Sequence, residues 1–279
     1  MRKETFDRSK AVFFIVFAFV FMILMFGVAD NCEGSRYKKG QQVCPDPVTT
    51  CEGVPVPVMV KECDDAVVSH KYYSLSYNEG CECANWVMYT LTREMVEGNL
   101  KRKDNFREDE CVKTGSAKPA DYSRSGYDKG HLCPAADMLF DKDAADETFY
   151  MSNICPQKHK FNAGIWLDIE KDVREFAKRK DSVYVITGPV LSEGLGTIGK
   201  YNKVAVPEYF YKVVYCKRFN KAIAFLVPQN LTYKNKGKAS DYVVSVDDVE
   251  NVTGINFLKG VENEASIEIS KGDYEWWKM

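Results

Sequence analysis

Two motif blocks in the middle of the chain constrain its fold and chemistry most strongly. The first, residues 125–138 (SGYDKGHLCPAADM), places His131, one of only three histidines, between an Asp-Lys-Gly approach and a Pro-Ala-Ala-Asp exit. The second, residues 149–166 (FYMSNICPQKHKFNAGIW), is followed closely by Glu170. Together the blocks offer an imidazole, two amides and a carboxylate, which is a set that suits metal-assisted hydrolysis of a phosphodiester.

Each of these side chains fits one requirement of that reaction. His131 suits the base that activates water, because its ordinary pKa lies near neutrality. A hard cation such as Mg²⁺ would stabilise the charge on phosphorus and the leaving oxygen, and it keeps most of its waters. Because waters fill most of the coordination shell, the amide oxygen of Asn162 alone can serve as the direct protein ligand of Mg²⁺. Glu170, about two helical turns further on, is placed to act through a metal-bound water.

The same residues also have simpler structural explanations. A lone histidine near glycine and proline, such as His131, is typical of a turn. Asn162 suits an N-cap, Asn153 suits a turn, and Glu170 suits an exposed helix position. Residue types alone leave these alternatives open.

A zinc site is a further alternative. His131, Cys133, Cys155 and His159 supply two imidazoles and two thiols, a set that zinc accepts. The short His-x-Cys spacing and an oxidising compartment favour instead a Cys133–Cys155 disulfide or two separate buried thiols.

The two blocks resemble the DNA/RNA non-specific endonucleases, a family that includes mitochondrial endonuclease G and secreted bacterial sugar-non-specific nucleases. The family signature is Asp-Arg-Gly-His, then Ser-Asn-x-x-Pro-Gln, then Asn-x-Gly-x-Trp. This chain has Asp-Lys-Gly-His, Ser-Asn-Ile-Cys-Pro-Gln and Asn-Ala-Gly-Ile-Trp in the same order. The resemblance covers about residues 68 to 258, and it includes the segments 86–93, 106–109, 183–189 and 204–211.

The resemblance implies a ββα-metal fold, in which a hairpin carries the catalytic histidine and the following helix carries the metal-binding asparagine. It assigns His131 as the general base and Asn162 as the direct Mg²⁺ ligand, with Mn²⁺ as a substitute. Glu170 becomes a carboxylate that contacts the metal through water. Asn153 becomes an active-site amide that supports the geometry of His131 and the metal. The implied products carry 5′-phosphates and 3′-hydroxyls.

Phosphate binding is the least defined part of the predicted site. The resemblance implies an arginine upstream of the signature, and Arg102 and Arg107 are the two candidates, with Arg102 favoured. Lys129 stands where the family usually has arginine. Lysine keeps the charge but loses the bidentate fork, so we expect weakened phosphate contact rather than lost catalysis.

The expected function is sequence-non-specific endonuclease activity on DNA and RNA, which the protein would contact through the phosphate backbone. The formal net charge of −2 argues against coating of nucleic acid through overall basicity, but it allows local phosphate binding. The main rival is a catalytically silent nucleic-acid-binding protein at a cell surface. A second copy of the chain, in a homodimer, is a further candidate partner.

The N-terminus predicts export. Residues 1–10 contain several positive charges and precede an uninterrupted apolar run at 11–29, which is either a transmembrane anchor or a cleaved signal peptide. The charge distribution places residues 1–10 in the cytoplasm and the body outside, either membrane-anchored or secreted or periplasmic. Ten cysteines fit an oxidising compartment, and residues 30–67 form a Cys/Pro-rich linker or small subdomain.

The remaining pattern predicts an α+β fold, with helices flanking a central antiparallel sheet. A hairpin is expected over 72–77 and 86–91, and a helix over 162–180. Further strands are expected at 182–187, 203–206, 210–216 and 222–227, with another helix at 245–252. The tail, 259–279, has no clear pattern.

Overall fold

The computed structural model describes residues 42, 44–60 and 65–279. The apolar run at 11–29 and the basic segment before it lie outside the described residues. Within the described part of the chain, no helix is long and apolar enough to cross a membrane. The described residues fall within one unit, Gln42–Met279.

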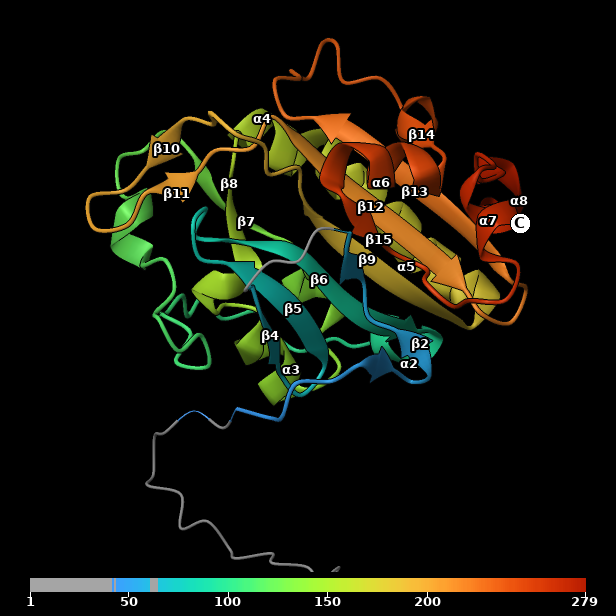
Figure 1. The fold of residues 1–279 in the computed structure, drawn as a ribbon, viewed down its shortest axis with the longest axis horizontal. Helices are drawn as coiled ribbons and strands as arrows, with labels where there is room; N and C mark the ends of the chain where they lie inside the picture. Colours follow the sequence, from blue (N-terminus) through green and yellow to red (C-terminus); the bar gives the residue numbers. More distant parts are fainter. Residues whose placement is uncertain (1–41, 43, 61–64) are drawn as a thin grey trace, which may run out of the picture. The chain divides into compact units, whose positions relative to one another are not determined.

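A seven-stranded antiparallel sheet forms the centre of this unit (Figure 1). Its strand order is β14-β13-β12-β9-β6-β5-β4. The strands are β4 (Ala66–Ser69), β5 (Tyr73–Asn78), β6 (Cys83–Thr92), β9 (Ser182–Pro189), β12 (Tyr209–Cys216), β13 (Lys221–Pro228) and β14 (Val243–Val244). The predicted α+β class, the 72–91 hairpin and the three long strands after residue 180 are confirmed.

Successive side chains of a strand point to opposite faces of the sheet, and both faces of this sheet are buried. In β6, Val87, Tyr89 and Leu91 join one hydrophobic cluster, whereas Trp86 and Met88 join the other. All five side chains are almost fully buried. The long central strands therefore read as nearly continuous apolar runs.

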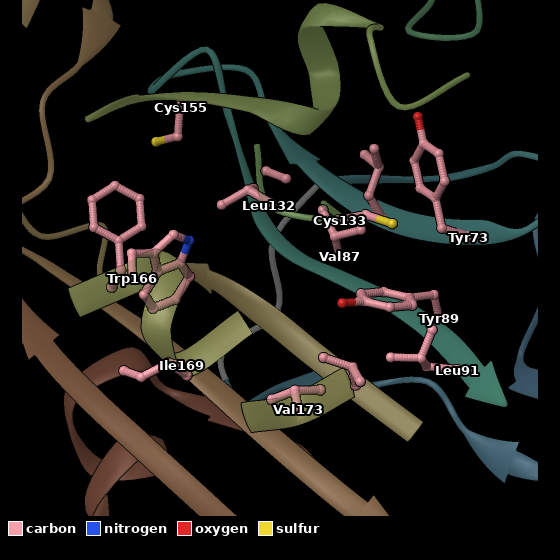
Figure 2. Packing of buried hydrophobic residues seen from close by; sticks show 14 of the residues in the cluster. Tyr73, Val87, Tyr89, Leu91, Leu132, Cys133, Cys155, Trp166, Ile169 and Val173 are labelled. Atoms are coloured by element: carbon pink, nitrogen blue, oxygen red, sulfur yellow. The ribbon is translucent and has the colours of Figure 1, made fainter. Parts of the chain in front are cut away.

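One face of the sheet is covered by α5 (Leu167–Lys180). Ile169 and Val173 of this helix belong to the same buried cluster as Tyr89 and Leu91 of β6, as Figure 2 shows. The last turn of the helix carries Lys178, Arg179 and Lys180, whose positive charges interact favourably with the helix dipole.

The opposite face is covered by α6 (Val246–Thr253), which buries Val246 and Val249. Ser245 caps this helix by accepting a hydrogen bond from the backbone of Asp248, and Gly254 ends it in the left-handed conformation. The following strand, β15 (Ile255–Asn256), pairs with β3 (Val58–Met59).

The tail that had no sequence pattern forms two short helices, α7 (Glu264–Glu268) and α8 (Tyr274–Lys278). Trp277 of α8 is 1% exposed, and its ring centroid lies 5.3 Å from that of Phe176 in α5. The end of the chain therefore contributes to the core.

Short elements complete the unit. A disulfide joins Cys44 to Cys111 and ties the N-terminal segment to the body. The other elements are β1 (Thr50–Cys51), β2 (Val54–Pro55), α2 (Arg93–Val96), α3 (Lys142–Glu147), β10 (Thr197–Ile198), β11 (Val204–Ala205) and the 3₁₀ turns η1 (Pro119–Tyr122), η2 (Ala135–Asp137), η3 (Met151–Asn153) and η5 (Ala239–Tyr242). The strand predicted at 203–206 is β11, which pairs with β10 outside the central sheet.

Candidate active site

The two motif blocks fold into one ββα unit. Strand β7 (Asp128–His131) pairs antiparallel with β8 (Ile154–Gln157), so that His131 lies opposite Ile154. A helical segment follows: α4 (His159–Phe161), a π-helical turn η4 (Asn162–Trp166), and then α5. The hairpin and helix expected from the resemblance are therefore present in this order.

Glycine is required in β7 because another side chain lies directly above it. A Cβ atom at Gly130 would overlap the side chain of Gln157, the fully buried last residue of β8. The close approach brings the two strands together directly beside His131.

His131 is a buried and neutral imidazole. It is 9% exposed, and its Nε2 atom has no hydrogen-bond partner among the described residues. Its ring lies edge-on to Phe149, with 5.0 Å between centroids, and near Phe106. Burial, together with the positive charge of Arg102, lowers the pKa of His131 to about 3. The imidazole is therefore an unprotonated acceptor at neutral pH.

Asn162 lies within the helical segment rather than at its start. The segment begins at His159, and Asn162 has helical angles of φ −57° and ψ −51°, so the N-cap alternative is not supported. Its Nδ2 donates a 2.9 Å hydrogen bond to Oδ2 of Asp128 in β7. The same Asp128 oxygen lies 2.9 Å from Nδ1 of His159. Oδ1 of Asn162 makes no hydrogen bond to any described residue, which leaves it available as a ligand.

Asn153 is fully buried and uses its amide on the backbone. Its Oδ1 accepts from the amide of Cys133, and its Nδ2 donates to the carbonyls of Cys133 and Thr148, each at 2.9 Å. These bonds hold the chain immediately after His131. Because these bonds occupy its amide, Asn153 is placed to position the chain beside His131 rather than to contact a substrate.

Glu170 is half-buried and sits in a group of charged side chains beneath the hairpin. Burial raises the pKa of Glu170 to about 7; Lys212 and Arg174 oppose this rise, and Asp137 adds to it. Glu170 makes no hydrogen bond or ion pair to any other described residue. Its carboxylate is therefore free to accept a water or a cation.

The other charged side chains of this group are one ion pair, Arg174 with Asp137, and the buried Lys212. Asp137 accepts hydrogen bonds from Nη1 of Arg174 at 2.7 Å and from the hydroxyl of Tyr89 at 2.8 Å. Lys212 is fully buried, donates to Thr187 at 3.0 Å, and lies 4.6 Å from the ring centroid of Trp166. Burial lowers the pKa of Lys212. The two cations balance Asp137 and Glu170 when all four groups are ionised.

The structure separates the two candidate arginines. Arg107 bonds to Asp146 at 2.7 Å and stacks over Tyr150 at 3.9 Å, so its guanidinium is already engaged. Arg102 lies over Phe149 at 5.3 Å, and its charge acts on both His131 and Glu170. Arg102 is therefore the arginine beside the site, although Asp104 also pairs with it at 2.6 Å.

Lys129 shares the His131 face of β7. Its Nζ lies 5.1 Å from the centroid of Phe106, the ring that also contacts His131. A lysine at this position presents one positive charge at the edge of the site. It lacks the planar fork with which arginine binds two phosphate oxygens.

Three charged residues of the site were missed from the sequence. Arg174 lies one turn beyond Glu170 on the same helix face, a spacing that was a usable signal. Lys212 interrupts the apolar strand β12, and a lone lysine in a buried strand is also a signal. Asp137 is in the first motif block, but its partners come from distant elements and have no local pattern.

The zinc alternative is not supported. The clusters of metal-ligating His, Cys, Asp and Glu side chains among the described residues do not include His131, Cys133, Cys155 or His159. Cys133 and Cys155 are separate buried thiols rather than the disulfide that was one expectation. The sulfur of Cys155 instead lies 3.2 Å from that of Cys83 in β6.

The donor set fits a hard divalent cation. Asn162 Oδ1 and the Glu170 carboxylate are oxygens without hydrogen-bond donors among the described residues, and Asp128 adds a carboxylate beside Asn162. Mg²⁺ takes such oxygens and retains waters, whereas zinc in structural sites prefers sulfur and nitrogen.

Known proteins are similar to this chain in sequence and in fold. A sequence profile described as DNA/RNA non-specific endonuclease matches residues 57–264. The chain belongs to this family. It is 33% identical over 213 residues to a nuclease of Nostoc sp., a match that covers 71% of this chain and 75% of that protein. It is also 33% identical over 208 residues to human mitochondrial endonuclease G, a match that covers 69% of each chain.

The solved structures agree with the sequence comparison. The crystal structure of the EndoG/EndoGI complex matches with a TM-score of 0.64 and 34% identity, covering 70% of this chain and 86% of that one. The chain is thus a hydrolase of the non-specific endonuclease family, whose members are typically metal-dependent and act on nucleic acids. The family match extends beyond the expected 68–258 at both ends.

Proposed function

We propose that this chain is a Mg²⁺-dependent endonuclease that hydrolyses phosphodiester bonds in DNA and RNA with little sequence preference. One observation carries the proposal. The ββα unit presents an unprotonated, buried His131 on its hairpin, and on its helix an Asn162 whose Oδ1 has no hydrogen bond within the described residues. A base and an oxygen ligand are the two components that such hydrolysis requires.

In this mechanism His131 accepts the proton of the attacking water. Its buried imidazole is neutral before substrate binds, so no proton has to leave it first. A bound phosphate brings negative charge beside the ring and raises the pKa of the imidazole, which strengthens it as a base. Asn153 maintains the backbone after His131 and thereby the direction of the ring.

Asn162 and, through water, Glu170 would hold Mg²⁺, with Mn²⁺ as a substitute. When bound, the metal supplies Lewis-acid stabilisation of the phosphate and of the leaving oxygen. Asp128 orients the Asn162 amide by accepting from Nδ2, so the oxygen rather than the nitrogen points away from β7. Products with 5′-phosphate and 3′-hydroxyl ends are expected.

Arg102 and Lys129 would bind the phosphate backbone. Both carry positive charge beside the two aromatic rings that contact His131. Arg102 lies over Phe149, and Lys129 lies over Phe106. Contacts to phosphates carry no sequence information, and this supports cleavage with little sequence preference.

We also propose that the protein is exported. The Cys44–Cys111 disulfide supports this placement, because disulfides persist mainly in oxidising compartments. The apolar run at 11–29 would act as an anchor or as a cleaved signal, and detergent partitioning of the full-length protein would separate the two.

Digestion of supercoiled plasmid and of structured RNA in Mg²⁺, with and without EDTA, tests the proposed activity. We expect both substrates to be cut, cleavage to stop in EDTA, and mapped ends to carry 5′-phosphates. Asn162→Ala should bind the same labelled DNA but cut it far more slowly. A wild-type protein that binds both nucleic acids and cuts neither would favour a catalytically silent binding protein.

A further inference from the structure

A second group of carboxylates lies on the face of the sheet opposite the ββα unit. Asp247 and Glu250 come from α6, and Glu268 comes from the last turn of α7. One oxygen from each lies within 4.8 Å of the others. Helix α6 packs in the hydrophobic cluster of Tyr211 and Phe257, whereas the backbone beside His131 packs in the other cluster. The group is therefore separate from the proposed catalytic site.

Glu268 is the unusual member of this group. It is only 5% exposed, and its Oε1 has no hydrogen-bond partner among the described residues. An ionised carboxylate buried without a donor is strongly unfavourable unless a cation compensates it. Burial, then the charges of Glu250, Glu264 and Asp247, and finally a proton shared with the Glu250 side chain raise the pKa of Glu268 to about 7.

The neighbouring charges do not neutralise this group. In the described part of the chain, none of Asp247, Glu250, Glu264 and Glu268 forms an ion pair within 4.0 Å. Glu250 accepts from the amide of Phe257 at 2.8 Å, and Glu264 accepts from the amide of Gly260 at 2.6 Å. These bonds fix the segment between the two helices, but they bring no donor to Glu268.

The three oxygens lie close enough together to share one Ca²⁺ ion. Two oxygens bound to the same Ca²⁺ at about 2.3–2.6 Å can be at most about 4.6–5.2 Å apart. The 4.8 Å limit for this group satisfies that condition. Ca²⁺ accepts several carboxylates in irregular geometry and completes its shell with water, whereas Mg²⁺ requires shorter bonds and usually binds only one or two carboxylates.

We propose that Asp247, Glu250 and Glu268 form a Ca²⁺-binding site that holds α7 against α6. The site stabilises the C-terminal part of the fold and takes no part in catalysis. It does not depend on the proposed nuclease activity, because its ligands come from different elements on the opposite face of the sheet.

Thermal unfolding of the full-length Asn162→Ala protein tests the site, because this background removes the proposed catalytic ligand. We expect about 5 mM Ca²⁺ to raise the melting temperature by roughly 3–8 °C over EDTA, and calorimetry to show one bound Ca²⁺ per chain. Adding Glu268→Gln should raise the melting temperature in EDTA, because it removes repulsion, and should abolish the response to Ca²⁺. Glu262→Gln, at an exposed position of the same segment, should keep the response and serves as the control.

Two results would overturn the proposal. The first is the absence of any Ca²⁺ response in the Asn162→Ala protein. In that case, a melting temperature of the Asn162→Ala protein that rises as the pH falls from about 8 to 5.5 would show that Glu250 and Glu268 share a proton in place of binding Ca²⁺. The second is a Ca²⁺ response that persists unchanged after Glu268→Gln.

Discussion

Nδ2 of Asn162 donates a 2.9 Å hydrogen bond to Oδ2 of Asp128, and this bond joins the helix of the ββα unit to the first residue of its catalytic strand. Because the nitrogen is engaged, the amide oxygen is the atom left free for a metal. The first residue of the Asp-Lys-Gly-His motif thus orients the amide of Asn162, the proposed metal ligand.

Asp128→Ala should therefore weaken metal binding. Without the acceptor, the Asn162 amide rotates freely, and loss of such a supporting partner typically costs about 10–100-fold in metal affinity. The half-saturating Mg²⁺ concentration for plasmid cleavage should rise by that factor. Asp128→Asn keeps an acceptor oxygen and should have a smaller effect. Equal Mg²⁺ dependence in wild type and Asp128→Ala would refute this function of Asp128.

Arg102 and Arg107 should separate into a functional and a structural arginine. Arg102→Ala should lower kcat/KM by about tenfold or more and leave the melting temperature nearly unchanged, because its exposed pair with Asp104 contributes little. Arg107→Ala removes the Asp146 pair and the stacking on Tyr150, so it should cost about 0.5–1.5 kcal/mol of stability with a much smaller effect on cleavage. The reverse result would reassign the phosphate contact to Arg107.

Lys129→Arg should increase the cleavage rate. The guanidinium can bind two phosphate oxygens where the ammonium offers a point charge, so we expect about a 2–10-fold gain in kcat/KM on plasmid DNA. Lys129→Met removes the charge and serves as the control, in which kcat/KM should fall. No gain with arginine, together with a clear loss with methionine, would show that charge alone matters at this position.

The sequence predicts those parts of this fold that are determined by residues close together in the chain. The β5–β6 hairpin, α5 and α6 follow from alternation, helical periodicity and the Ser245 cap, which nearby residues determine. The exact start of the catalytic helix was not predictable, because His159 and the π-helical turn at Asn162–Trp166 carry no periodic pattern. The burial of Trp277 depends on contact with Phe176, about a hundred residues earlier, which no local pattern encodes.

The site shows the same division. His131, Asn162 and Glu170 belong to contiguous motifs, so their residue types and spacing were sufficient to select them. Local sequence was not sufficient for the contacts of Lys212 and Asp137, because the charged side chains come together from η2, β12 and α5. Their neutral partners Tyr89 and Thr187 come from β6 and β9. Likewise, the choice between Arg102 and Arg107 required knowing which arginine Asp146 engages.

Glu170 should make the stability of the metal-free protein depend on pH. Its pKa rises from an ordinary 4.5 to about 7 on folding, so the folded state holds this proton more tightly than the unfolded state. The resulting stabilisation is present below pH 4.5 and is lost as the pH rises through about 7. Relative to Glu170→Gln, the wild type should therefore lose about 1–3 kcal/mol between acidic and alkaline pH. Urea unfolding of both proteins in EDTA at pH 5 and pH 8 measures this difference, and parallel pH profiles would contradict it.

Lys212→Met should be strongly destabilising. It removes the buried cation that acts on both Glu170 and Asp137, and removal of one partner from a buried charged group typically costs about 3–5 kcal/mol. Adding Glu170→Gln should recover part of the loss, because it removes the uncompensated charge. Urea denaturation of the two single variants and the double variant measures the coupling. Strictly additive effects would show that Lys212 and Glu170 do not interact.

The central claim is that His131 is the base of a phosphodiester hydrolysis. The most direct measurement compares single-turnover plasmid cleavage by wild type and His131→Ala in saturating Mg²⁺, with folding checked by circular dichroism and DNA binding measured in EDTA. We predict that His131→Ala folds and binds DNA like the wild type but cuts about 100–10,000-fold more slowly. Cleavage by His131→Ala at the wild-type rate would contradict the account.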